Sequence, residues 1–179
     1  MKVRQLSVLL LCLLLLSACG YHNPNVIPAS RDLPPTRIHV PMWTNATSQM
    51  GLEVKAHNAV SNQLTQSDRV MLIADQAQAE YVLSGHINSL SFPGFAYDPT
   101  STVRSLTAVM TVTVTISARA SGRIIWQDMN LRLEQNYNLG ATVSQSDANK
   151  RRALDQLVDN LAEQVYLRAL RSLNRNRQL

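Results

Sequence analysis

The sequence has few of the residue patterns that catalysis needs. It has no Gly-x-Ser-x-Gly motif, no glycine-rich phosphate-binding run and no His-Glu-x-x-His motif. Its histidines are scattered, with no acidic residue, cysteine or second histidine at a matching spacing: His22, His39, His57 and His86. We therefore expect a binding or assembly protein and not an enzyme, with no metal site.

Charge is also sparse. Charged residues make up 16% of the chain, with 17 basic and 12 acidic side chains. Without Lys2 and Arg4, which lie in the leader described below, 15 basic side chains stand against the same 12 acidic ones. This mild excess argues against a nucleic-acid partner but suits an anionic one, such as a phosphorylated lipid.

Both cysteines lie near the N-terminus, Cys12 within an apolar run and Cys19 just after it. The run follows Lys2 and Arg4 and has about ten apolar residues, well short of the roughly 20 that a membrane-spanning helix needs. Residues 1–18 are therefore predicted to be a secretory signal peptide. Neither cysteine would remain for a disulfide, so the fold must rely on packing.

The end of this leader, Leu16-Ser17-Ala18-Cys19, resembles the lipobox of exported bacterial lipoproteins. The resemblance implies cleavage before Cys19, a diacylglycerol thioether on its sulfur and an acyl group on its new amine. Gly20 after the cysteine implies sorting to the outer membrane, and this lipid is the only attached group that we expect. The alternative is an ordinary signal peptide with a cysteine near its cleavage site by chance.

The segment after the cysteine, residues 19–36, contains four prolines among polar residues and is predicted to be an extended tether. Fully stretched, it would reach about 50 Å from the lipid anchor. The folded domain is expected over residues 37–173, followed by a basic tail at 174–179.

Alternating and helical spacings predict the elements of this domain. Strands are expected at 37–43 and 80–90, with a third possible short strand at 70–73, and a long hairpin at 110–118 and 124–137. Helices are expected at 49–66 and from a capping box at Ser144-Gln145-Ser146-Asp147 onward. These elements predict a two-layer α+β domain, with two helices packed on one face of a mainly antiparallel four-stranded sheet.

Two further expectations concern the strand at 80–90 and the segment at 91–102. Gly85 lies on the apolar side of the strand at 80–90, where we expect it to allow a close approach of the covering helix. Residues 91–102 are expected to form a loop because Pro and Gly recur there. The aromatic residues of this loop either fold back onto the core or contact a partner.

Three motifs together resemble the LptE family of lipopolysaccharide-assembly lipoproteins. They are Cys19-Gly20-Tyr21-His22, the segment from Pro41-Met42-Trp43 to Gly51-Leu52-Glu53, and Ala79-Glu80-Tyr81-Val82-Leu83-Ser84-Gly85-His86-Ile87. Glu80 departs from the Asp of the family pattern. The resemblance implies two helices on a four-stranded sheet. It also implies that the protein forms a plug within the outer-membrane β-barrel LptD. The plug and the barrel together would insert lipopolysaccharide into the outer leaflet.

Candidate contacts for lipid phosphate lie near the ends of the long hairpin: Arg104, Arg119 and Arg123. The alternative for each one, which the sequence favours when the residues are taken singly, is a solvated charge at the rim of the sheet. The Thr-rich side of the hairpin suits a polar barrel lumen. The alternative function is that of an outer-membrane lipoprotein that regulates a cell-wall synthase, because such regulators also place a small α+β domain on a proline-containing tether.

Overall fold

The computed structural model describes residues 34–97 and 103–177. The expected signal peptide, Cys19 and most of the expected tether fall outside these ranges. What the structure describes is therefore the domain that follows Pro34.

The first part of this domain is a strand–helix–strand unit. Strand β1 (Thr36–His39) and the short strand β2 (Thr44–Asn45) precede helix α2 (Leu52–Thr65) and strand β3 (Val70–Leu72). Because α2 carries the chain back along the sheet, β3 pairs with β1 in parallel. The helix turns one apolar stripe inward, as the spacing predicts: Leu52, Ala56, Val60 and Leu64.

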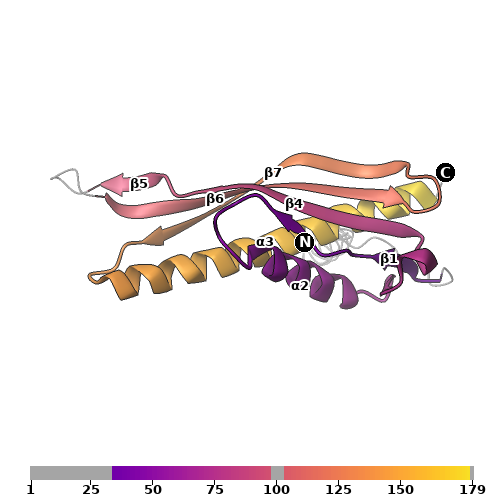
Figure 1. Ribbon diagram of the computed structural model, residues 1–179, viewed down its shortest axis with the longest axis horizontal. Coiled ribbons are helices and arrows are strands. Elements are labelled where there is room, and N and C mark those ends of the chain that lie inside the picture. Colours follow the sequence, from indigo (N-terminus) through magenta and orange to yellow (C-terminus); the bar gives the residue numbers. More distant parts are fainter. Residues whose placement is uncertain (1–33, 98–102, 178–179) are drawn as a thin grey trace, which may run out of the picture. The chain divides into compact units, whose positions relative to one another are not determined.

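The second part of the sheet consists of longer, antiparallel strands. The 3-10 helix η1 (Gln76–Gln78) leads into β4 (Tyr81–Ser91), which is followed by β5 (Gly94–Tyr97), β6 (Val103–Ala118) and β7 (Ile124–Asn138). β6 and β7 form the long hairpin that alternation predicts, and β4 and β5 pair with the opposite side of β6. β1 and β2 pair in parallel with β4, so the order across the sheet is β3, β1, β4 and β6, with β7 beyond β6 (Figure 1).

The α+β class and the two helices on the sheet are confirmed, but the expected four-stranded, mainly antiparallel sheet is wrong. The described sheet has seven strand segments and is mixed. The parallel part arises because a helix connects β1 to its neighbour β3. Of the additional strands, β3 occupies the stretch at 70–73 that was expected as a possible short strand. β2 and β5 have two and four residues, too few for alternation to reveal them.

The stretch at 91–102 is only partly a loop. β5 occupies Gly94–Tyr97, and residues 98–102 lie outside the described part of the chain. The Phe92 ring packs edge-on against Tyr137, with centroids 6.3 Å apart, and the Lys150 ammonium lies 4.2 Å from the centroid of Phe92. For Phe92, the structure therefore shows folding back onto the core.

The long helix α3 (Val143–Arg177) begins earlier than predicted. Its cap is Thr142, whose Oγ1 accepts a hydrogen bond from the backbone amide of Gln145 at 3.2 Å. The Gln145 side chain in turn accepts one from the amide just before Thr142, at 3.0 Å. The capping box predicted at Ser144 is therefore wrong by two residues. The helix ends at Arg177, so residues 174–177 are helical.

Both helices cover the same face of the sheet (Figure 1). The core lies between these two layers. Its largest fully buried side chains include residues of α2, β4, β6 and α3: Leu52, Leu64, Leu83, Ile87, Met110, Ile116, Leu157, Leu161 and Leu173. α3 contacts β6, β7 and α2, so it spans both the hairpin and the strand–helix–strand unit.

Gly85 has a different role from the one expected. A Cβ atom at this position would lie 2.2 Å from Cδ2 of Trp43, whose side chain is 2% exposed. The close approach is therefore made by the indole ring of Trp43, which lies between β1 and β2, and not by a covering helix. This contact fixes the start of β2 against the middle of β4.

Candidate functional site

The sheet face that the helices leave open is lined mainly by polar side chains. They alternate with core residues on the three longest strands: Ser84 and His86 on β4, Thr111, Thr113, Thr115 and Ser117 on β6, and Gln127 on β7. Several are hydrogen-bonded across strands. His86 Nδ1 lies 2.6 Å from the hydroxyl of Thr44, and the amide of Gln127 donates to Thr115 at 3.0 Å. We call this surface the polar face.

At the centre of the polar face, irregularities in two strands lie on either side of Thr113. The pairing of β4 with β6 changes register at Asn88. The pairing of β6 with β7 changes register between the pairs Val112–Leu131 and Val114–Asp128. The Asn88 amide donates to Thr113 Oγ1 at 3.0 Å, and the Thr113 hydroxyl donates to the carbonyl of Met129 at 3.0 Å. Polar groups freed by the irregular pairing are thus satisfied by side chains on this face.

The charges on the β7 part of the polar face are paired. Arg132 Nε lies 2.6 Å from Glu134 Oε1, and both side chains are more than half exposed. At such exposure the pair contributes little to stability, but it leaves this part of the face without a local excess of charge. The polar face is therefore a surface of hydroxyl and amide groups, suited to contact with another polar, water-containing surface.

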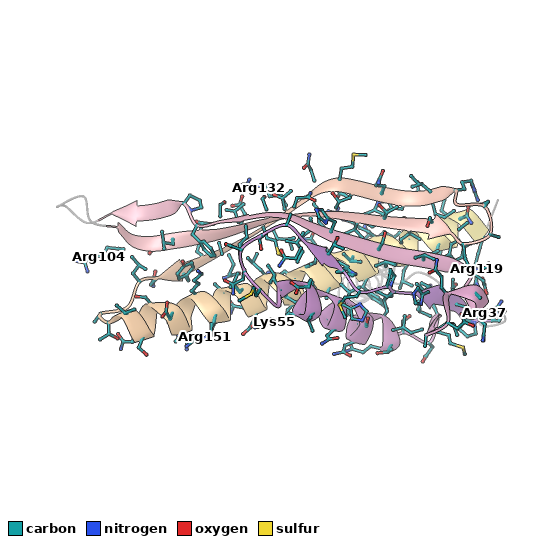
Figure 2. The ribbon with its side chains drawn as sticks, in the orientation of Figure 1. Arg37, Lys55, Arg104, Arg119, Arg132 and Arg151 are labelled. Carbon is teal, nitrogen blue, oxygen red and sulfur yellow. The ribbon has the colours of Figure 1, made fainter. Side chains whose placement is uncertain are left out.

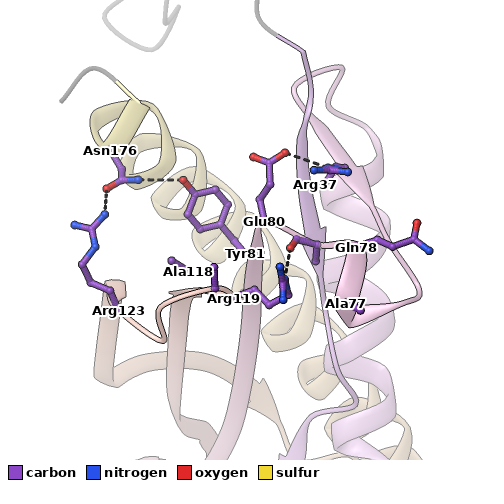
Figure 3. Close-up of a pocket in the computed structure, with 11 residues that line it drawn as sticks. Arg37, Ala77, Gln78, Glu80, Tyr81, Ala118, Arg119, Arg123 and Asn176 are labelled. Atoms are coloured by element: carbon purple, nitrogen blue, oxygen red, sulfur yellow. Dashed lines mark hydrogen bonds and ion pairs between the residues drawn. The ribbon is translucent and has the colours of Figure 1, made fainter.

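A second feature is a pocket of about 450 Å³ at one end of the domain, where β1, β4, the β6–β7 turn and the end of α3 meet (Figure 3). Two of the predicted phosphate contacts, Arg119 and Arg123, line it together. Arg37 from β1 adds a third guanidinium. We call it the basic pocket.

Polar contacts order the walls of the basic pocket. Arg37 Nε donates to Glu80 Oε1 at 3.1 Å, and Arg119 Nε donates to the carbonyl of Ala79 at 2.9 Å. Arg123 Nη2 donates to Asn176 Oδ1 at 2.8 Å (Figure 3). Each of these described bonds uses one nitrogen of a guanidinium, which has three nitrogens and five N–H donors.

The far side of the basic pocket ties α3 to β4. The Asn176 amide donates to the hydroxyl of Tyr81 at 3.0 Å, and Arg177 Nη2 lies 3.8 Å from Glu80 Oε2. Sequence reasoning missed Arg37, Glu80 and Asn176 as neighbours of Arg119. They come from three elements distant in sequence, and no local motif links them.

The third predicted contact, Arg104, lies at the opposite end of β6 from Arg119 (Figure 2). Its backbone carbonyl accepts a hydrogen bond from the amide of Leu139 at 2.9 Å. A smaller pocket of about 220 Å³ near the same end of β7 is lined by Asn138, Asn149 and Arg152, among others. The three predicted arginines therefore belong to two separate places, and no single phosphate group can contact all three.

Within the described residues, no group of three or more His, Cys, Asp or Glu side chains is arranged to hold a metal ion. Nor is any helix in residues 34–97 and 103–177 both long and apolar enough to cross a membrane. The features that stand out in this part of the chain are thus surfaces for contact: the polar face and the basic pocket.

Solved structures of lipoproteins share the fold. Rare lipoprotein B from Shewanella oneidensis is 14% identical, with a TM-score of 0.58 over 80% of this chain and 100% of that one. A minor lipoprotein from Acinetobacter baumannii is 20% identical, with a TM-score of 0.51 over 79% and 92%. Uncharacterized lipoprotein B from Nitrosomonas europaea is 11% identical, with a TM-score of 0.54 over 75% and 82%. A comparison with curated proteins gives no match.

These similarities show the fold alone, whereas a family model assigns the chain to a family. The model of the LptE family, described as lipopolysaccharide-assembly, matches residues 36–169. This span runs from the first residue of β1 to within eight residues of the end of α3 and includes the whole polar face. The chain therefore belongs to the LptE family of lipopolysaccharide-assembly lipoproteins.

Proposed function

We propose that this protein is anchored to the outer membrane by lipid on Cys19, forms a plug within an LptD-type β-barrel, and helps insert lipopolysaccharide into the outer leaflet. The observation that carries the proposal is the polar face, in a chain whose family is one of lipopolysaccharide assembly. The lumen of a large outer-membrane barrel is polar and water-filled. A surface of Thr, Ser, Asn and Gln side chains can hydrogen-bond there without burying unpaired charge.

The helix layer is less suited to such a contact. The outward side of α3 carries exposed carboxylates at Asp155, Asp159 and Glu163. Lys55 of α2 forms an exposed ion pair with Asp155 at 2.6 Å. This side is a solvated surface, and we assign the barrel contact to the polar face.

Co-extraction from outer membranes tests the proposal. In mild detergent, the wild-type protein should purify in a stable complex with a β-barrel much larger than itself. Thr113→Glu and Thr115→Glu together should release it, because two uncompensated carboxylates would then be buried against the barrel wall. The matched control places the same charge on the helix layer, with Asn160→Glu and Gln156→Glu, and should retain the complex. Recovery of the wild type as a free monomer, or with a periplasmic cell-wall synthase, would refute the proposal.

Lipopolysaccharide contact belongs to the same proposal, at two points. Arg104 at one end and the pair Arg119 and Arg123 at the other are candidate partners for phosphate groups. Arg104→Glu and the double change Arg119→Glu/Arg123→Glu should each weaken lipopolysaccharide binding and reduce its salt dependence. Arg132→Glu is the control, because Arg132 already lies beside a carboxylate. Unchanged affinity in either variant removes that point of contact.

A further inference from the structure

One end of the domain concentrates positive charge. Arg37, Arg119 and Arg123 line the basic pocket, and the last turn of α3 adds Arg175 and Arg177. Arg175 is exposed. One carboxylate, that of Glu80, pairs with two of these five arginines, Arg37 and Arg177. In a protein of modest overall charge, this end is clearly cationic.

The chain enters the domain at the same end. The carbonyl of Pro34, the first described residue, accepts a hydrogen bond from Arg177 Nη1 at 3.1 Å. Only 14 residues separate Pro34 from the proposed lipid attachment at Cys19. They can span at most about 50 Å, so the cationic end is the part of the domain from which the path to the membrane starts.

We propose that this end docks on the anionic phospholipid headgroups of the leaflet that holds the Cys19 lipid. The inference goes beyond the proposed function but shares with it the lipid anchor and two arginines, Arg119 and Arg123, which that proposal offers as contacts for lipopolysaccharide phosphate. Each Lys or Arg near an anionic membrane surface strengthens association about fivefold. Five arginines lie at this end of the domain. The tether keeps the headgroups at a high effective concentration, so individually weak contacts suffice. Docking would orient the domain, with Arg104 and β5 directed away from that leaflet.

The test uses the full lipidated protein in vesicles, without a barrel. Cys19 carries lipid and Cys12 is removed with the leader, so an introduced cysteine is the only free thiol. A dye at Ala120→Cys, on the rim of the basic pocket, reports docking through quenching by headgroup-labelled lipids. A dye at Ala141→Cys, before α3, is the matched reporter at the other end. Both positions are exposed.

With phosphatidylglycerol in the vesicles, the Ala120 reporter should be quenched more than the Ala141 reporter, and the difference should fall in pure phosphatidylcholine or at high salt. Arg37→Gln, Arg123→Gln and Arg175→Gln together should lower the docking constant by about a hundredfold. The control removes the same charge elsewhere, with Arg132→Gln, Arg151→Gln and Arg152→Gln. Figure 2 shows Arg132 and Arg151 away from Arg37 and Arg119. The control should lose less than about fivefold.

Three results would overturn the inference. One is equal quenching of the Ala120 reporter with and without phosphatidylglycerol. Another is an equal fall in the docking constant in both triple variants. The third is docking on vesicles that contain lipopolysaccharide but not on those that contain phosphatidylglycerol, which would assign the arginines to lipopolysaccharide. Because these vesicles contain no barrel, failure here is distinct from failure of the barrel complex.

Discussion

The contact between Gly85 and Trp43 offers a sharp test of the packing that positions the polar face. In Gly85→Ala, the new methyl would lie 2.2, 2.3 and 2.4 Å from three indole carbons. Carbon atoms pack best at about 3.5–4.0 Å, so the buried ring must move by more than about 1 Å. Forcing atoms into a packed core costs about 1–3 kcal/mol, and losing a buried Trp contact entirely costs about 3–5 kcal/mol. We expect Gly85→Ala to lower the free energy of unfolding by about 2–4 kcal/mol.

A double-mutant cycle isolates this contact. In a Trp43→Leu background the indole is gone, and Gly85→Ala should then cost less than about 1 kcal/mol. Gly122→Ala is the control, since its backbone has a φ of 67° but nothing lies within 4 Å of a Cβ there, and it should cost about 1 kcal/mol. Urea unfolding followed by far-UV circular dichroism measures all of these. A Gly85→Ala cost that is the same in both backgrounds would refute the reasoning.

Three further predictions concern stability. Thr142→Ala should cost about 1 kcal/mol through loss of the α3 cap, whereas Ser144→Ala should cost almost nothing, and urea unfolding compares them. Burial raises the pKa of Tyr137 in the folded protein, so its hydroxyl ionises at a lower pH in the unfolded chain than in the folded one. The stability that the neutral hydroxyl provides should be fully present below about pH 10 and be lost as the pH rises through the folded-state pKa. Tyr137→Phe should weaken this loss. Removing the exposed ion pair with Lys55→Met or Asp155→Asn should change the melting temperature by about two degrees or less, corresponding to under about 0.5 kcal/mol.

Long periodic patterns predicted the elements that form most of the core. The alternation of Leu83, Gly85 and Ile87 gave the correct buried side of β4. On β7, the alternation of Met129, Leu131 and Leu133 was correct for the two leucines, but Met129 is 63% exposed, near the register shift of this strand. These positions are buried because burial of apolar area dominates folding, and a strand shows its two faces in alternate residues. The stripe on α2 was correct for the same reason.

Errors arose where the structure depends on contacts distant in sequence. The parallel pairing of β1 with β3 depends on where α2 packs, and the role of Gly85 depends on Trp43, 42 residues earlier. One local signal was available but missed. On β4 the apolar positions switch from odd numbers to an even one at Leu90, which marks the register shift at Asn88.

The candidate contact residues were only partly predictable. Arg119 and Arg123 flank a predicted turn, so their proximity follows from the hairpin. Arg37 joins them only because β1 pairs with β4, and Arg177 only because α3 continues to the same end. The separation of Arg104 from the other two follows from the length of β6, 16 residues, which exceeds the strand that alternation predicted.

Site-specific photo-crosslinking in living cells tests the central claim most directly. A photoreactive residue at Thr115, on the polar face, should crosslink to a large outer-membrane β-barrel, whereas the same residue at Asp159, on the outer side of α3, should give little or no such product. We expect this asymmetry because, in the proposed complex, the polar face and not the helix layer meets the barrel wall. Crosslinks to the barrel from Asp159 but not from Thr115, or to a cell-wall synthase from either position, would contradict it.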